Sequence, residues 1–360
     1  MKIGVISSYA CIRTANNYGA LLQYYALQKY LKKRGHDVFW IRSIIPQSRI
    51  HIFLRHLKNY RNPVFIYKFY RCHKSFLDFQ KKFLNVTSKE YKGNIDLSID
   101  CPPADFYITG SDQVWGGTLK ENYLCFVKDS SKKIAYAVSF GRDNLDESHA
   151  SIVMPWINEF NAISVRESSG VNICKKLLGR NVEHLLDPTL LIKASLYPSS
   201  SSSNTSSLLY CYFLNISGTE EIKINEIRML SKKLAIPLKI AACQYSEIFF
   251  QREELVMPTP EQWLQNYRDA KYIVTNTFHG TVFAIIFHKP FVTILQSGAS
   301  SSQNGRMISL LTMLELSDRI LTDLPLEETI SKPIKWENVE KILDLYRKKT
   351  DNFLIYWIFR

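Results

Sequence analysis

The strongest constraint on the fold is that short and long apolar segments alternate along the chain. Residues 2–9, KIGVISSY, begin with a short apolar run and have the pattern of a buried strand. Residues 17–35 carry apolar side chains at helical spacing and end in a basic turn, and residues 36–43 again have the pattern of a strand. Strand–helix–strand units form parallel sheets with helices on their faces. The sequence therefore predicts the α/β class.

A serine-rich run divides this alternation into two halves. After residues 197–207 the pattern restarts, with a strand at 208–215, a helix at 220–234 and a strand at 237–243. A chain of 360 residues also exceeds the usual size of a single hydrophobic core. We predict two doubly wound, Rossmann-like domains facing a cleft, with the polar loops after the strands lining that cleft. The predicted boundaries are 1–196, a linker at 197–207, 208–330, and a final helical segment at 331–360 that packs back on the first domain.

The charge balance favours an anionic partner. Lys and Arg number 46 against 33 acidic residues, which gives a formal net charge of +13. Residues 49–82 hold nine Lys or Arg against one acid, Asp78, interleaved with Phe and Tyr. We interpret them as part of a basic helical insertion, about 49–90, that meets anionic lipid headgroups or an anionic lipid-linked acceptor. An ordinary solvated face is the alternative. No nucleic-acid recognition motif accompanies the stretch, so nucleic acid is not an expected partner.

The cysteines and the first ten residues indicate the cellular compartment that we expect for the protein. Seven cysteines include no C-x-x-C pair, which argues against a zinc site and against a disulfide framework. The segment MKIGVISSYA has the pattern of a first strand rather than of a signal peptide. No apolar run reaches the length that crosses a bilayer. We expect a soluble, cytoplasmic protein, with peripheral contact at the inner face of the membrane as a further hypothesis.

One histidine lies where a strand is followed by a helix. In residues 272–295, His279 and Gly280 occupy the polar turn between two apolar runs. Backbone N–H groups at a helix N-terminus attract phosphate or carboxylate, and a glycine lets such a ligand approach the backbone. Asn276 and Thr277 add hydrogen-bonding groups. The alternative is that Asn276 or Thr277 caps the helix and that His279 is a core histidine.

Two further strands end in polar side chains. In TGSDQVW, residues 109–115, Ser111 and Asp112 are substrate-contact candidates; Asp112 either holds a substrate hydroxyl, caps a helix or forms a local turn. Arg166 follows an apolar strand and precedes Glu167. It either clamps a carboxylate or phosphate through its guanidinium or forms a structural ion pair.

Two loops complete the candidate site. The loop after the first strand contains Asn17 and Gly19 but no G-x-G-x-x-G, so the dinucleotide fingerprint is absent. We expect both residues to face the cleft. The small-residue loop at 297–306 ends in Arg306 and precedes an amphipathic run, and it either closes over a ligand or lacks a fixed structure.

Taken in order, five blocks resemble the polysaccharide pyruvyl transferase family over roughly residues 3–320: NNYGALLQYYALQKYL, TGSDQVW, SVRE, LLDPTLL and TNTFHGTVFAIIFHKPF. The resemblance implies two domains related to the GT-B glycosyltransferases. It also implies transfer of pyruvate from phosphoenolpyruvate onto two hydroxyls of a sugar, or of a lipid-linked oligosaccharide, as a cyclic ketal. Neither a metal nor a cofactor is expected beyond phosphoenolpyruvate as the donor.

The resemblance also assigns residues. It implies that His279 is the active-site histidine, acting as general acid and base, and that Arg166 is the arginine of the S-x-R block. The phosphate and carboxylate of the donor are expected at Arg166, at Arg306 and at the amides around Gly280. Asp112 is expected to hold the sugar or to assist as a base, together with Asn17.

This chain departs from the family at one position. Several members carry an arginine two residues before the histidine, where this chain has Thr277. Arg306 and Lys289 are the candidates to supply the missing charge.

Two other functions fit the same sequence. A GT-B glycosyltransferase would bind a nucleotide sugar, and the adjacent acids Glu253 and Glu254 are its candidate ribose contact. A basic adaptor would instead bind anionic glycan or membrane through residues 49–82.

Overall fold

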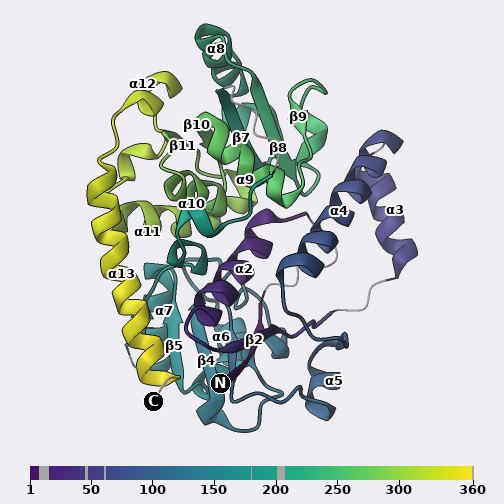
Figure 1. Ribbon diagram of the computed structural model, residues 1–360, viewed down its shortest axis with the longest axis vertical. Helices are drawn as coiled ribbons and strands as arrows, with labels where there is room; N and C mark the ends of the chain where they lie inside the picture. Colours follow the sequence, from purple (N-terminus) through teal and green to yellow (C-terminus); the bar gives the residue numbers. More distant parts are fainter. Residues whose placement is uncertain (8–15, 45–47, 61, 180, 201–206, 359–360) are drawn as a thin grey trace.

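The computed structural model describes residues 1–7, 16–44, 48–60, 62–179, 181–200 and 207–358, and it contains two parallel sheets, one in each half of the chain (Figure 1). The first sheet has the order β2-β1-β3-β4-β5-β6, with strands β1 (Lys2–Ile6), β2 (Asp37–Trp40), β3 (Phe106–Thr109), β4 (Lys133–Val138), β5 (Ala162–Val165) and β6 (Glu183–His184). The second has the order β11-β10-β7-β8-β9, with strands β7 (Leu208–Leu214), β8 (Leu238–Cys243), β9 (Leu255–Val256), β10 (Ala270–Thr275) and β11 (Phe291–Thr293). All neighbouring strands pair in parallel, so the predicted α/β class with two doubly wound sheets is confirmed.

Helices connect these strands and cover the sheets. They are α2 (Tyr18–Lys32), α3 (Arg49–Tyr60), α4 (Pro63–Phe83), α5 (Gly93–Ile99), α6 (Glu147–Asn158), α7 (Ser168–Leu178), α8 (Ile224–Leu234), α9 (Pro260–Asp269), α10 (Phe278–Ile286), α11 (Gly305–Met313), α12 (Leu326–Ser331) and α13 (Trp336–Trp357).

Each sheet has one place where the chain reverses the direction in which strands are added. In the first sheet the chain passes from β1 to β2 on one side and later to β3 on the other side of β1. In the second sheet β8 and β10 flank β7 in the same way. The loops after the two inner strands diverge at such a point and leave a crevice at the carboxyl edge of the sheet. Each half of the molecule therefore offers one crevice, built by the loops after β1 and β3 and by the loops after β7 and β10.

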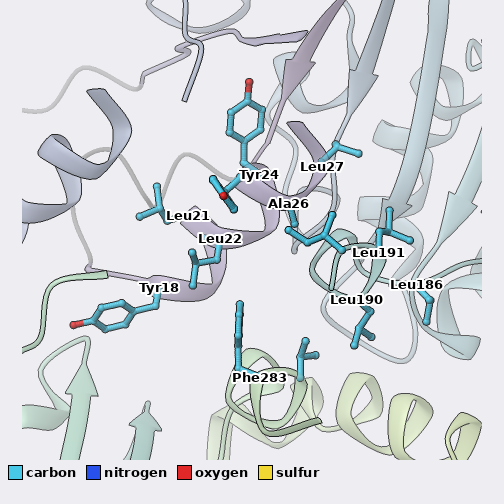
Figure 2. Packing of buried hydrophobic residues seen from close by; sticks show 14 of the residues in the cluster. Tyr18, Leu21, Leu22, Tyr24, Ala26, Leu27, Leu186, Leu190, Leu191 and Phe283 are labelled. Carbon is cyan, nitrogen blue, oxygen red and sulfur yellow. The ribbon is translucent and has the colours of Figure 1, made fainter. Parts of the chain in front are cut away.

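Helix α2 joins the two halves through a shared hydrophobic core. Its residues belong to one continuous cluster of buried side chains that also includes Phe283 of α10 and Leu190 of the first half (Figure 2). At its first residue, the ring of Tyr18 stacks on that of Trp263 with 5.0 Å between centroids. The Tyr18 hydroxyl donates a hydrogen bond to the Pro258 carbonyl at 2.7 Å. This aromatic contact between the halves fixes the start of α2.

The C-terminal helix lies against the first half of the chain. Asp351 of α13 accepts hydrogen bonds from Tyr30 and Arg34 at the end of α2, and Arg347 donates to the Leu190 carbonyl at 2.9 Å. The basic insertion is observed as the hairpin of α3 and α4, on one side of the molecule (Figure 1). Of the predicted linker, residues 201–206 lie outside the described residues.

A search of the helices among the described residues found none with the length and apolarity needed to span a membrane.

The α3–α4 hairpin is anchored to the second half by a buried carboxyl group. Glu247 is buried, and its Oε1 accepts a hydrogen bond from the Tyr60 hydroxyl at 3.0 Å. Burial raises the pKa of Glu247 to about 7. A carboxyl group with a raised pKa binds a proton in the folded state that the unfolded chain has already lost, so its contribution to stability falls as pH rises from about 4.3 toward 7.

We therefore expect Glu247→Gln, which keeps an acceptor for Tyr60, to reduce the decline in unfolding free energy between pH 5 and pH 7. The upper bound on the gain at neutral pH is about 3 kcal/mol, because one pKa unit corresponds to about 1.4 kcal/mol. Urea unfolding of both proteins across this range measures the effect. Parallel pH profiles for the two proteins would contradict the assignment.

Candidate functional site

A cavity of about 340 Å³ lies between the crevices of the two sheets. Residues after β1 and β3 line one side, and residues after β7 and β10, together with the loop before α11, line the other. The predicted cleft between two domains is therefore present, at the carboxyl edges of both sheets. Its lining residues are Asn17, Asp112, Gln113, Tyr212, Leu214, Asn215, Gln244, Thr277, Phe278, His279, Gln296, Gln303 and Arg306.

His279 enters the cavity from the first turn of α10. The helix is apolar around its whole circumference and is therefore buried. Thr277 is its N-cap: the Thr277 Oγ1 atom accepts a hydrogen bond from the backbone N–H of Gly280 at 2.9 Å. The preceding N–H groups, those of Phe278 and His279, have no partner in their own helix and remain available to an anion. The His279 side chain is 8% exposed, so it is reached from the cavity alone.

Two glycines allow the backbone to approach closely at this point. A Cβ atom on Gly19 would lie 2.1 Å from His279 Nδ1, so the first turn of α2 rests against the imidazole ring. A Cβ atom on Gly280 would lie 2.1 Å from the Thr275 Oγ1 atom. Gly19 does not line the cavity; it lies against the ring of His279 from the opposite half, and its predicted contact with a substrate stays a prediction.

Asp187 lies behind His279, and the sequence reasoning missed it as a site residue. Its Oδ2 atom is 3.6 Å from His279 Nε2 and accepts hydrogen bonds from Ser111 Oγ at 2.9 Å and from Arg166 Nη1 at 2.8 Å. Its Oδ1 atom accepts from the backbone N–H of Thr189 at 3.0 Å. The polar residue between two apolar runs in LLDPTLL, directly after a strand, was the available signal. The contact places a buried carboxylate directly behind the imidazole ring of His279.

Arg166 is enclosed by carboxylates of the protein itself. Its side chain has no exposed surface, and its nitrogen atoms lie 2.8 Å from Asp187, 3.3 Å from Asp112 and 3.6 Å from Glu167. The guanidinium carbon lies 4.3 Å from the centroid of the Phe278 ring, which lines the cavity. Arg166 is not among the cavity-lining residues. The sequence allowed either a ligand clamp or a structural ion pair for Arg166, and the observed contacts are those of the ion pair.

The charges in this cluster change one another's pKa values. Burial alone would raise the pKa of Asp187 and Asp112, but His279 and Arg166 outweigh it and lower both. Burial alone would lower the pKa of Arg166, and the three carboxylates raise it instead. For Glu167 burial prevails, and its pKa is raised. The two aspartates are therefore ionised at neutral pH beside His279 and Arg166.

Arg306 is the permanent cation among the described residues that line the cavity. Its guanidinium donates to Gln303 Oε1 at 2.8 Å and to the Gln303 carbonyl at 3.2 Å. Burial and the nearby Arg166 lower the pKa of Arg306 to about 10, so it stays charged at neutral pH. Lys289 follows the other end of α10 and does not line the cavity, so Arg306 alone remains as the replacement for the family's arginine.

Of the three interpretations of Asp112, the structure shows the local turn, and the contact with a substrate hydroxyl stays a prediction. Its backbone is left-handed, with φ of 77°, and its carbonyl accepts from the Val114 N–H at 2.8 Å, which forms a local turn. Its side chain lines the cavity and accepts from Arg166. Ser111, by contrast, is fully buried and donates to Asp187, so its hydroxyl serves the carboxylate rather than the cavity.

The side chains of the two remaining candidates, Asn276 and Asn17, form hydrogen bonds with backbone groups. The Asn276 amide exchanges two hydrogen bonds with the backbone of Leu214 at the end of β7, at 2.7 and 2.9 Å, and does not line the cavity. Asn17 caps α2 by accepting from the Ala20 N–H at 3.2 Å and also lines the cavity. The sequence reasoning missed the glutamines of the lining, including Gln113, which lies in the quoted segment TGSDQVW next to Asp112.

Comparison with known proteins gives a family and a fold. A family model described as polysaccharide pyruvyl transferase matches residues 17–298. A search of curated protein sequences gave no significant match.

Among solved structures, a UDP-GlcNAc 2-epimerase of Methanocaldococcus jannaschii, in complex with UDP-GlcNAc and UDP, is 12% identical, with a TM-score of 0.54 over 99% of this chain and 100% of that one. A glycotransferase of kitacinnamycin is 12% identical, with a TM-score of 0.51 over 99% and 98%. The MnaA protein of S. aureus, in a co-structure with UDP, is 11% identical, with a TM-score of 0.52 over 99% and 96%. These structures show a shared GT-B-like fold.

Proposed function

Because the chain belongs to the polysaccharide pyruvyl transferase family, we propose that it moves pyruvate from phosphoenolpyruvate onto two hydroxyls of a sugar. The acceptor is a cell-surface polysaccharide or its lipid-linked precursor, and the product is a cyclic ketal. The observation that carries the proposal is the position of His279: it faces a cavity between the two halves, beside Arg306 and in front of the buried Asp187.

The donor is bound as an anion in this proposal. Phosphoenolpyruvate carries a phosphate and a carboxylate, and both need fixed positive charge or N–H donors. Arg306 supplies the charge, and the first N–H groups of α10, those of Phe278 and His279, supply donors. Arg166 acts indirectly, by holding Asp112 and Asp187 in place.

His279 handles the proton. It gives a proton to the methylene carbon of the enol, which becomes a methyl group, and an oxocarbenium-like centre forms at the neighbouring carbon. One sugar hydroxyl adds to that centre, phosphate leaves, and the second hydroxyl closes the ring. Of the two hydroxyl protons, one replaces the proton taken from His279 and the other leaves with phosphate. Asp187 lies behind the imidazole, 3.6 Å from its Nε2 atom, and supports the ring in this position.

The acceptor lies toward the first half of the chain. Asp112 and Asn17 line that side of the cavity together with Gln113, and their oxygens and amide groups suit the hydroxyls of a sugar. No further cofactor is part of the proposal.

The direct test incubates the protein with phosphoenolpyruvate and a panel of lipid-linked oligosaccharides. We expect acceptor-dependent release of phosphate and a product with the mass gain of one pyruvate ketal. Phosphate release without a ketal product, or neither signal with any acceptor of the panel, would count against the proposal.

Arg306→Ala should weaken donor binding specifically. A charged hydrogen bond contributes roughly 1.5–3 kcal/mol, so we expect the apparent KM for phosphoenolpyruvate to rise about 10- to 100-fold, with a smaller change in the KM for the acceptor. Steady-state phosphate release measures both constants. Lys289→Ala is the matched control, since this cation lies outside the cavity. An unchanged donor KM in Arg306→Ala would place the anion site elsewhere.

A nucleotide-sugar glycosyltransferase is the second candidate, and the shared GT-B-like fold favours it. Of its candidate ribose contact, the pair Glu253 and Glu254, the second is already engaged, because both carboxylate oxygens of Glu254 bind Arg228, at 2.7 and 2.9 Å. A thermal-shift screen separates the two functions. Stabilisation by phosphoenolpyruvate but not by nucleotide sugars favours pyruvyl transfer, and the reverse result favours the glycosyltransferase.

A further inference from the structure

Helix α3 turns an apolar stripe toward solvent. Ile50, Phe53, Leu54 and Leu57 are spaced three, one and three residues apart, which places them on one face of a helix. Their exposed fractions are 69%, 45%, 53% and 41%. A surface helix of a globular protein normally turns such a stripe toward the core. Here the stripe faces outward.

The flank of α3 beside this stripe is already packed. His56 and Tyr60 are buried, and their rings contact Phe69 of α4 and Tyr245 of the second half, with centroids 4.4–5.9 Å apart. The Tyr60 hydroxyl bond to Glu247 fixes this orientation. The hairpin therefore cannot bury its apolar stripe by rolling over without giving up these contacts.

Helix α4 extends the same kind of surface. Val64, Tyr67 and Tyr70, spaced three residues apart, are 49%, 66% and 41% exposed, while Ile66 and Phe69 of the same helix are buried. Figure 1 shows the two helices together at one edge of the molecule, with α3 on the outer side. Single exposed apolar residues are common, but two adjacent helices that both expose them indicate a contact surface.

The charge of the hairpin indicates which kind of partner this surface contacts. Residues 49–82 contain nine Lys or Arg and the single acid Asp78. Exposed cations of the two helices include Lys58 and Lys74. A second copy of this chain would bring two such hairpins together and set positive charge against positive charge, in a protein of net charge +13. A bilayer with anionic headgroups offers the opposite charge together with an apolar layer.

We propose that the outer face of the α3–α4 hairpin lies in the plane of a bilayer surface that contains anionic lipid. Ile50, Phe53, Leu54 and Leu57 enter the headgroup–acyl boundary, and the surrounding Lys and Arg side chains contact the headgroups. The inference does not depend on which group the enzyme transfers, so it can fail or hold independently of the proposed function.

Vesicle sedimentation of the full chain tests the proposal. We expect binding to phosphatidylcholine vesicles that contain phosphatidylglycerol, and at least tenfold weaker binding to phosphatidylcholine alone. The double variant Phe53→Ser, Leu54→Ser should weaken binding at least tenfold, as should Lys58→Glu with Lys74→Glu. Raised salt should weaken vesicle binding by the wild type. All four residues are exposed, so the fold is expected to persist, and circular dichroism checks this.

Ile355→Ser with Tyr356→Ser is the matched control, because these side chains are similarly exposed on α13, away from the hairpin. It should bind vesicles as the wild type does. Equal binding by the Phe53/Leu54 variant and the wild type would overturn the proposal. Sedimentation velocity without lipid gives a second way to overturn it: a dimer that the Phe53/Leu54 variant dissociates would make this face an interface between two copies.

Discussion

Replacing His279 by alanine is expected to lower pyruvyl transfer by roughly 10²- to 10⁴-fold, the usual contribution of a general acid or base. The reason is its position: the ring faces the cavity, Asp187 stands 3.6 Å behind it, and no other histidine lines the cavity among the described residues. Acceptor-dependent phosphate release from phosphoenolpyruvate measures the loss. The donor KM should change much less than kcat, since Arg306 remains in place.

The control for this variant is His288→Ala, two turns and more along the chain. His288 is exposed, stacks on Trp336 and pairs with Glu340, and it does not line the cavity. We expect it to keep near-wild-type turnover. Phosphate release by the folded His279→Ala protein at the wild-type rate would remove His279 from the chemistry and leave it as a packing residue.

The positions of His279, Asp112 and Arg306 could be inferred from the sequence for a general reason. Polar residues that directly follow apolar strands gather at one edge of a parallel sheet, and two such edges face each other in a doubly wound pair of domains. His279 and Asp112 satisfy that pattern locally, whereas Arg306 follows a small-residue loop, and the structure places all three around the cavity. Their catalytic and binding roles remain predictions.

The surroundings of Arg166 could not be inferred in the same way. Its partner Glu167 is the next residue in the chain, but Asp112 and Asp187 follow two other strands, and only the order of the strands in the sheet brings them to the same guanidinium. The local sequence shows an arginine at the end of a strand. It leaves open whether that arginine pairs with carboxylates of the protein or binds a ligand. The same limit applies to α3: helical spacing defines its apolar face without saying that this face is turned outward.

Arg166→Met is expected to lower the free energy of unfolding by about 3–5 kcal/mol, the typical cost of removing one partner from a buried ion pair. Three buried carboxylates would lose their common counter-charge, which is a large fraction of the roughly 5–15 kcal/mol that stabilises a typical protein. Urea unfolding at pH 7 measures the loss. Ser111→Ala is the matched control, because it removes one neutral donor to Asp187 and should cost only about 1 kcal/mol.

The pH dependence distinguishes lost charge pairing from lost packing in Arg166→Met. In the wild type the pKa values of Asp112 and Asp187 are lowered, so their contribution to stability is complete above about pH 4 and is lost as pH falls toward their folded-state pKa values. Without Arg166 the pKa values of the two aspartates rise. Their unpaired charges destabilise the variant until they bind protons, and they do so at a higher pH than in the wild type. The stability difference between the two proteins should therefore be largest near neutral pH and should shrink as the solution is acidified toward pH 4. A difference that stays constant over that range would mean that Arg166 stabilises the fold through its packing against Phe278 rather than through its charge.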